Sequence, residues 1–185
     1  MATSTPVLIP VEEYLNTSYH PDCDYVDGQI LERNMGEKPH SRLQGFFAAF
    51  FRSREDEWNI EVLTEQRLQI NPTRYRIPDV MVTSLEGPDE LIVRTPPILC
   101  VEIFSSKDRP RKTQERADDY ARIGVQATWA IDPWRHRAYA AAADGVLHEE
   151  PGALRVAGTP ISITVAAVFD ELIRLEKRFA NQAKK

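Results

Sequence analysis

The chain has 185 residues, of which 42% are hydrophobic and 28% charged, so it is long enough to bury a core without disulfides. No stretch approaches the ~18 apolar residues of a membrane helix, and no signal sequence is evident, so we expect one cytoplasmic domain over residues 1–185 with a core at about 11–176. The net charge of −5 argues against unaided binding to nucleic acid, but it leaves open an enzyme whose metal ion supplies positive charge.

The first third of the chain predicts a short helix, a hairpin and a long helix. A helix over 10–15 has Pro10 near its start. Cys23–Val26 and Gln29–Arg33 flank the dipeptide Asp27-Gly28, which is typical of a type I′ hairpin turn. Between about 39 and 57, large apolar residues recur at helical spacing and predict a helix with a buried aromatic stripe. The stripe consists of Leu43, Phe46, Phe47, Phe50 and Phe51.

Three strands are predicted in the middle of the chain, over 60–70, 76–83 and 98–104. The second contains Pro78 close to its beginning, a position that tolerates a residue without an N–H group. The third is apolar at nearly every position, as in a strand that is covered on both faces. Its Cys100, like Cys23, lies among apolar neighbours, which favours buried free thiols over a disulfide.

The second half predicts a helix from about 111 to 122 that ends at Gly124, followed by a strand over 128–133. A strand, a helix and a second strand imply a right-handed crossover and a parallel pair. Short hairpin strands and a final helix complete the chain. We expect these strands at 136–143, 145–150 and 154–156, and the helix at 165–179.

Glu102 is the most informative residue because it interrupts an apolar strand. A buried carboxylate costs stability unless it is paired or binds a metal, so an ion pair with a nearby Arg or Lys and a metal site are both open. Asp79 follows Pro78 at the head of another apolar strand. If these strands are neighbours, the two carboxylates can converge on Mg²⁺ or Mn²⁺, which would activate water and stabilise a scissile phosphate.

The spacing from Pro78-Asp79 to Val101-Glu102-Ile103 resembles the core motif of the PD-(D/E)XK nuclease superfamily. Further ordered segments resemble the Uma-type family of proposed restriction endonucleases within it. These segments are Tyr25–Gly28, His40, Glu102–Ser106, Tyr120–Val125 and Trp129–Pro133. The resemblance extends from about Val11 to Phe169.

This resemblance implies an α/β restriction-endonuclease-like fold, with a mixed central β-sheet flanked by α-helices. It also implies that Asp79 and Glu102 bind Mg²⁺ or Mn²⁺. Gln66 matches a position that could line the same site, or it is a surface residue of an edge strand. The implied activity is metal-dependent hydrolysis of phosphodiester bonds in nucleic acid, with DNA as the expected substrate. A homodimer is compatible with this activity, because cutting both strands of a duplex often needs two sites.

One departure from the family pattern concerns its cation. Phe104 stands where the superfamily has lysine, and Arg116 stands where family members often carry a lysine on the following helix. Arginine can hold a phosphate, but it stays protonated and cannot act as a base. Lys112 lies one helical turn before Arg116 and shares its face.

Several other residues are candidates for the site. Lys107 and Lys112 are possible substitutes for the missing lysine, and Gln114 could orient a water molecule. His40 either contacts substrate or simply lies at a helix start. The sequence therefore predicts an endonuclease, and its alternative is a catalytically degenerate nucleic-acid or protein-binding module that keeps the nuclease fold.

Overall fold

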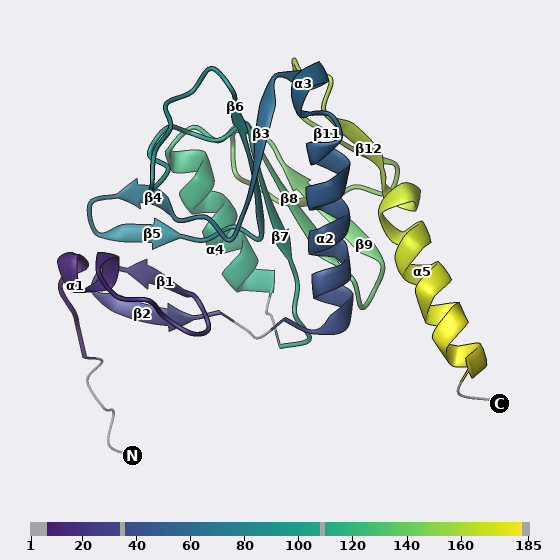
Figure 1. Ribbon diagram of the computed structural model, residues 1–185, viewed down its shortest axis with the longest axis horizontal. Helices are drawn as coiled ribbons and strands as arrows, with labels where there is room; N and C mark the ends of the chain where they lie inside the picture. The colour runs from purple at the N-terminus through teal and green to yellow at the C-terminus, as the bar shows by residue number, and fades with distance from the viewer. Residues whose placement is uncertain (1–6, 34–35, 108–109, 183–185) are drawn as a thin grey trace.

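A central mixed β-sheet organises the molecule (Figure 1), for which a computed structural model describes residues 7–33, 36–107 and 110–182. Its strand order is β10-β9-β8-β7-β6-β3, and β7 and β8 are parallel whereas the other neighbours are antiparallel. The strands are β3 (Ile60–Thr64), β6 (Val80–Ser84), β7 (Leu99–Ile103), β8 (Ala127–Asp132), β9 (Arg137–Ala141) and β10 (His148–Glu149). Helix α4 (Pro110–Arg122) joins β7 to β8, so the predicted crossover and parallel pair are confirmed.

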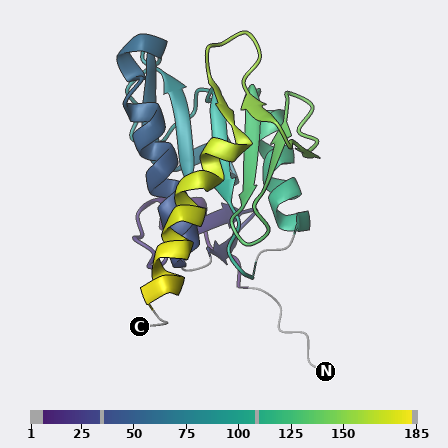
Figure 2. The same ribbon diagram turned by 90° about the vertical axis from the view of Figure 1, so that its right-hand side faces the viewer.

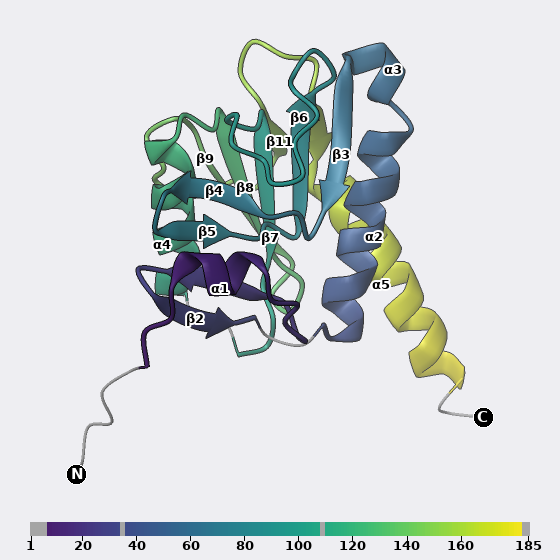
Figure 3. The same cartoon turned by 60° about the vertical axis from the view of Figure 1, so that its left-hand side comes forward.

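A second, smaller sheet lies beside α4 and has the strand order β2-β1-β5-β4 (Figure 3). Its strands are β1 (Cys23–Val26), β2 (Gln29–Glu32), β4 (Leu68–Asn71) and β5 (Arg74–Arg76), and the short helix α1 (Val11–Leu15) packs on it. Asp27 and Gly28 have φ angles of 50° and 90°, so both turn residues adopt the left-handed conformation that a type I′ turn requires. The predicted hairpin is therefore confirmed.

Two predicted strands were wrong, because each spans two strands in different sheets. The stretch 60–70 breaks at Glu65, whose φ of 52° turns the chain from β3 into β4. The stretch 76–83 contains the end of β5 and most of β6, and Ile77-Pro78-Asp79 crosses from the small sheet to the central one. Apolar residues lie on both sides of each break, but the breaks themselves fall in the polar stretch Thr64–Arg67 and at Pro78-Asp79, where the chain turns from one sheet to the other.

Helices cover both faces of the central sheet. Helix α2 (Lys38–Arg52), followed by the short α3 (Glu55–Trp58), and helix α5 (Val165–Gln182) lie on one face (Figure 2). Their core includes Phe47, Phe51 and the fully buried Trp129 of β8, so the predicted aromatic stripe is confirmed. Helix α4 and the small sheet cover the opposite face, where Tyr120 packs in a cluster with Met81 and Cys100.

The C-terminal region contains a strand pair that was only half predicted. Strand β11 (Ala153–Arg155) pairs with β12 (Ser162–Thr164), a strand too short to show a pattern in the sequence. The final helix α5 begins directly after β12 and runs three residues past the predicted end at Phe179. Within the described residues, no helix is both long enough and apolar enough to cross a membrane.

Candidate active site

Asp79 and Glu102 lie beside each other, Asp79 just before β6 and Glu102 within the neighbouring strand β7. Asp79 directly precedes β6, in which Val80 pairs with Val101 of β7, and Glu102 is the next residue along β7. Because side chains alternate along a strand, Glu102 lies on the same face as Cys100, which is the face that α4 covers. Both acids line one pocket of about 50 Å³. The predicted convergence of the two carboxylates is therefore present.

The Asp79 carboxylate is held by three different elements. One oxygen, Oδ2, accepts a hydrogen bond of 2.6 Å from the backbone N–H of Ile103. The other, Oδ1, forms an ion pair with the guanidinium of Arg33, which follows β2, and lies 3.3 Å from Nε2 of His40 in the first turn of α2. The orientation of Asp79 is thus fixed by the backbone of β7, and its second oxygen meets the Arg33 guanidinium and the His40 imidazole.

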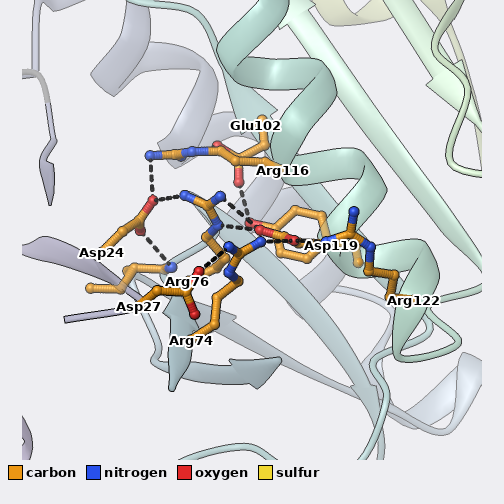
Figure 4. A network of polar contacts seen from close by, with 10 residues as sticks. Asp24, Asp27, Arg74, Arg76, Glu102, Arg116, Asp119 and Arg122 are labelled. Carbon is orange, nitrogen blue, oxygen red and sulfur yellow. Dashed lines mark hydrogen bonds and ion pairs between the residues drawn. The ribbon is translucent and has the colours of Figure 1, made fainter. Parts of the chain in front are cut away.

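The Glu102 carboxylate is held by two side chains of α4 (Figure 4). Arg116 donates to Oε2 at 2.5 Å, and the hydroxyl group of Tyr120 donates to Oε1 at 2.5 Å. The two donors are four residues apart, so they project from the same face of the helix. The ion pair that the sequence left open as an alternative for Glu102 is therefore present, and its partner is Arg116.

Arg116 also joins the site to a network of buried charges that ties α4 to the small sheet (Figure 4). Its other terminal nitrogen lies 3.0 Å from Asp24 of β1. Asp24 in turn contacts Arg76 at 2.9 Å, and Arg76 reaches Asp119 at 2.7 Å. Each of these two arginines thus bridges two carboxylates, which compensates much of the cost of burying charge. The network holds α4, and with it Arg116, in a fixed position over Glu102.

The two acids respond differently to burial. Burial disfavours the charged form of Asp79, but Arg33 and His40 outweigh it and hold the pKa of Asp79 below its usual range. Burial raises the pKa of Glu102 above its usual range, although Arg116 opposes this shift, and the nearby charge of Asp79 adds to it. Two adjacent carboxyl groups with pKa values shifted in opposite directions are typical of functional sites.

The acid pocket also brings together several of the other predicted site residues. His40, Lys112 and Arg116 line it with the two acids, so the expected helix face of Lys112 and Arg116 does face this pocket. Phe104 borders the pocket as well, and its ring stacks on Tyr139 with the ring centres 6.1 Å apart. An aromatic side chain thus occupies the place where the superfamily pattern has a lysine.

Three of the predicted residues do not line the acid pocket. Gln114 lies two residues from both Lys112 and Arg116, so it projects from another side of α4, where it donates to the carbonyl oxygen of Gly145 at 2.7 Å. Gln66, in the link between β3 and β4, donates to Leu91 and lines a separate cavity of about 400 Å³. Lys107 is exposed in the turn after β7 and is not among the lining residues.

Three residues that hold the acids, directly or through Arg116, were not among the predicted site residues, namely Arg33, Tyr120 and Asp24. Arg33 lies 46 residues before Asp79 in the sequence. Asp24 lies in β1 and Arg116 in α4, so these two residues are also far apart in the sequence. Asp24 carried a weak signal, because it is a charged residue between Cys23 and Tyr25 in an otherwise apolar strand. Arg33 carried none, since it follows the edge strand of a hairpin and resembles any surface arginine.

The donor set of the pocket fits a hard divalent cation, because it offers two carboxylates from neighbouring strands. Within residues 7–33, 36–107 and 110–182, no group of three or more His, Cys, Asp and Glu side chains forms a larger metal site. Both oxygens of each carboxylate already have a protein partner. An ion at Asp79 and Glu102 would therefore compete with these partners for the carboxylate oxygens.

Comparisons with known proteins agree on the type of fold. The family model Uma2, described as "Putative restriction endonuclease", matches residues 11–159. A crystal structure from Anabaena variabilis ATCC 29413, described as "a putative nuclease belonging to DUF820", superposes with a TM-score of 0.75 at 20% sequence identity. The superposition covers 88% of this chain and 98% of that chain. A search of curated proteins gave no match. The likeness confirms the predicted restriction-endonuclease-like α/β fold.

Proposed function

Because the chain belongs to the Uma2 family, as its ordered motifs predicted, we propose that it is a metal-dependent endonuclease that cuts phosphodiester bonds in nucleic acid, DNA first among them. One observation carries this proposal. Asp79 and Glu102 meet in a pocket that is also lined by Arg33, Lys112 and Arg116. Paired carboxylates suit Mg²⁺ or Mn²⁺, and clustered cations suit the phosphate of the substrate.

In this mechanism Asp79 and Glu102 would hold the ion. Mg²⁺ or Mn²⁺ would supply Lewis acidity to the phosphate oxygens and to the attacking water. The Ile103 N–H group keeps Asp79 aimed into the pocket, and Tyr120 orients Glu102. Lysine and arginine side chains stabilise the negative charge that develops on the attacked phosphate. Water adds to phosphorus, one P–O ester bond breaks, and the leaving oxygen takes up a proton.

The test is a cleavage assay with the full chain on plasmid DNA, a single-stranded oligonucleotide and RNA. Reactions contain Mg²⁺, Mn²⁺ or EDTA, and Asp79→Asn is the control, because it keeps the shape of the side chain and removes the charge. We expect cleavage with a divalent ion by the wild type and none with EDTA or the variant. Equal cleavage by wild type and variant would assign the activity to a contaminant and overturn the proposal.

A second candidate function is a nucleic-acid or protein-binding module that has kept the fold without the chemistry. The observation that favours it is that all four carboxylate oxygens of Asp79 and Glu102 have protein partners, while Phe104 replaces the superfamily lysine. Under this hypothesis the wild type binds labelled DNA equally well in EDTA and in Mn²⁺ and cuts it in neither.

A nuclease that cuts both strands of a duplex would act as a homodimer. Sedimentation at micromolar concentration tests whether the chain forms one.

A further inference from the structure

The two arginines that neutralise the acids are held in different ways. Arg116 is shared between Glu102 and Asp24, with contacts of 2.5 and 3.0 Å, and Asp24 is itself anchored to Arg76. In the described part of the chain, the guanidinium of Arg33 has Asp79 as its one ion-pair partner. Without Glu102, Arg116 would still be paired with Asp24. Among the described residues Arg33 forms no second ion pair, although the charges of Glu102 and Asp24 also act on it.

Arg33 also lies between two hollows of very different size. The acid pocket has a volume of about 50 Å³. A wider depression of about 380 Å³ shares Arg33, His40 and Asp79 with the acid pocket. The Arg33 side chain therefore forms part of the wall between the acids and the wider depression. If this side chain swings away from Asp79, the two hollows become one.

Asp79 stays in place without Arg33. Its Oδ2 atom keeps the 2.6 Å hydrogen bond from the Ile103 N–H group, which belongs to the rigid centre of the sheet. Its Oδ1 atom, the one that contacts Arg33, is the oxygen left facing the pocket. A cation that replaces Arg33 at Oδ1 thus finds a carboxylate that is already oriented.

We propose that Arg33 is the catalytic cation of this site: it leaves Asp79 when a divalent ion binds there and then contacts the phosphate of the nucleic acid. Arg116 remains between Asp24 and Glu102 as a positioning residue. The inference rests on the proposed nuclease function and assigns to the β2 hairpin the charge that Phe104 cannot supply. Under this proposal Arg33, and not Arg116, supplies the positive charge of the missing lysine. The guanidinium of Arg116 is already paired with two buried carboxylates.

The first measurement is Mn²⁺ binding by isothermal titration calorimetry with the full chain. Arg33→Gln removes the competing charge from Asp79 and should bind Mn²⁺ about tenfold more tightly, which corresponds to about 1.4 kcal/mol. The matched control is Arg67→Gln, because Arg67 is also partly buried but donates to the backbone oxygens of Leu15 and Thr17 and forms no ion pair with a carboxylate of the described residues. Its Mn²⁺ affinity should equal that of the wild type.

The second measurement is cleavage of a single-stranded oligonucleotide at saturating Mn²⁺. Arg33→Gln should cut about 10²–10³ times more slowly in spite of its tighter metal binding. Arg33→Lys should recover part of this loss, since a lysine also supplies a positive charge to a phosphate. A residue that only supports the fold would lower metal affinity and cleavage together.

The outcomes separate this proposal from the one on which it rests. If the wild type binds Mn²⁺ and cuts, but Arg33→Gln binds Mn²⁺ no more tightly or cuts at the wild-type rate, the role of Arg33 is rejected and the nuclease remains. If neither the wild type nor Arg33→Gln binds Mn²⁺, the metal site and the role of Arg33 fall together. A thermal melt of each variant in EDTA checks that all of them are folded.

Discussion

Replacing Asp24 by asparagine should show how strongly the buried charge network holds the site. Asp24 is 1% exposed and accepts from Arg76 at 2.9 Å, from the Ile77 N–H group at 3.1 Å, and contacts Arg116 at 3.0 Å. Asparagine can still accept from Ile77, but it removes the negative charge that both arginines share. The substitution therefore removes the charge of the side chain while keeping its shape.

The size of the effect follows from these contacts. Removing one partner of a buried ion pair costs about 3–5 kcal/mol, because it leaves an uncompensated charge in the interior. Here each arginine keeps another carboxylate, Asp119 for Arg76 and Glu102 for Arg116. We therefore expect a loss at the lower end of that range, about 3 kcal/mol in the free energy of unfolding.

The assay is urea unfolding followed by circular dichroism, with Asp27→Asn as the control. Asp27 pairs with Arg74 in the same network, but its side chain is 53% exposed, so its loss should cost less than about 1 kcal/mol. Equal losses for the two variants would show that burial does not decide the strength of these pairs. A change of less than about 0.5 kcal/mol for Asp24→Asn would refute the reasoning, since such values are usual for surface substitutions.

Three further outcomes are expected. Glu102→Gln should lose Mn²⁺ binding in calorimetry. It should stay folded, because Arg116 keeps its pair with Asp24, and urea unfolding should show a loss of about 1–3 kcal/mol in the free energy of unfolding. A variant that is unfolded in metal-free buffer would show that Glu102 is a purely structural residue. Phe47→Ala should lower the free energy of unfolding by about 3–5 kcal/mol, because the ring is fully buried against Trp129; a loss below about 1 kcal/mol would contradict that packing. Burial raises the pKa of the Cys100 thiol well above its usual value. Cys100 should therefore resist a thiol reagent at pH 8 until urea unfolds the chain. Rapid labelling of Cys100 in the native protein would contradict this.

Local features of the sequence were enough for much of the fold. The Asp27-Gly28 turn requires two left-handed residues and so predicted its hairpin, and the aromatic stripe of α2 follows from helical spacing. The apolar run of β7 marked a strand covered on both faces, which made Glu102 conspicuous. The strand boundaries at Glu65 and Pro78 were missed, because each short polar break separates two apolar segments that belong to different sheets, and sheet membership is a property of the packed chain.

The sequence by itself determined the family, the mixed α/β architecture and the pair of acids, because motif order, periodicity and an acid in an apolar strand are all properties of short segments. Only the tertiary structure decided which cations meet those acids. Arg33 reaches Asp79 across 46 residues, and Asp24 holds Arg116 because the small sheet packs against α4. Such pairs depend on how two sheets and a helix pack together, and an arginine at the end of a hairpin carries no local pattern that distinguishes a buried partner from a solvated surface charge.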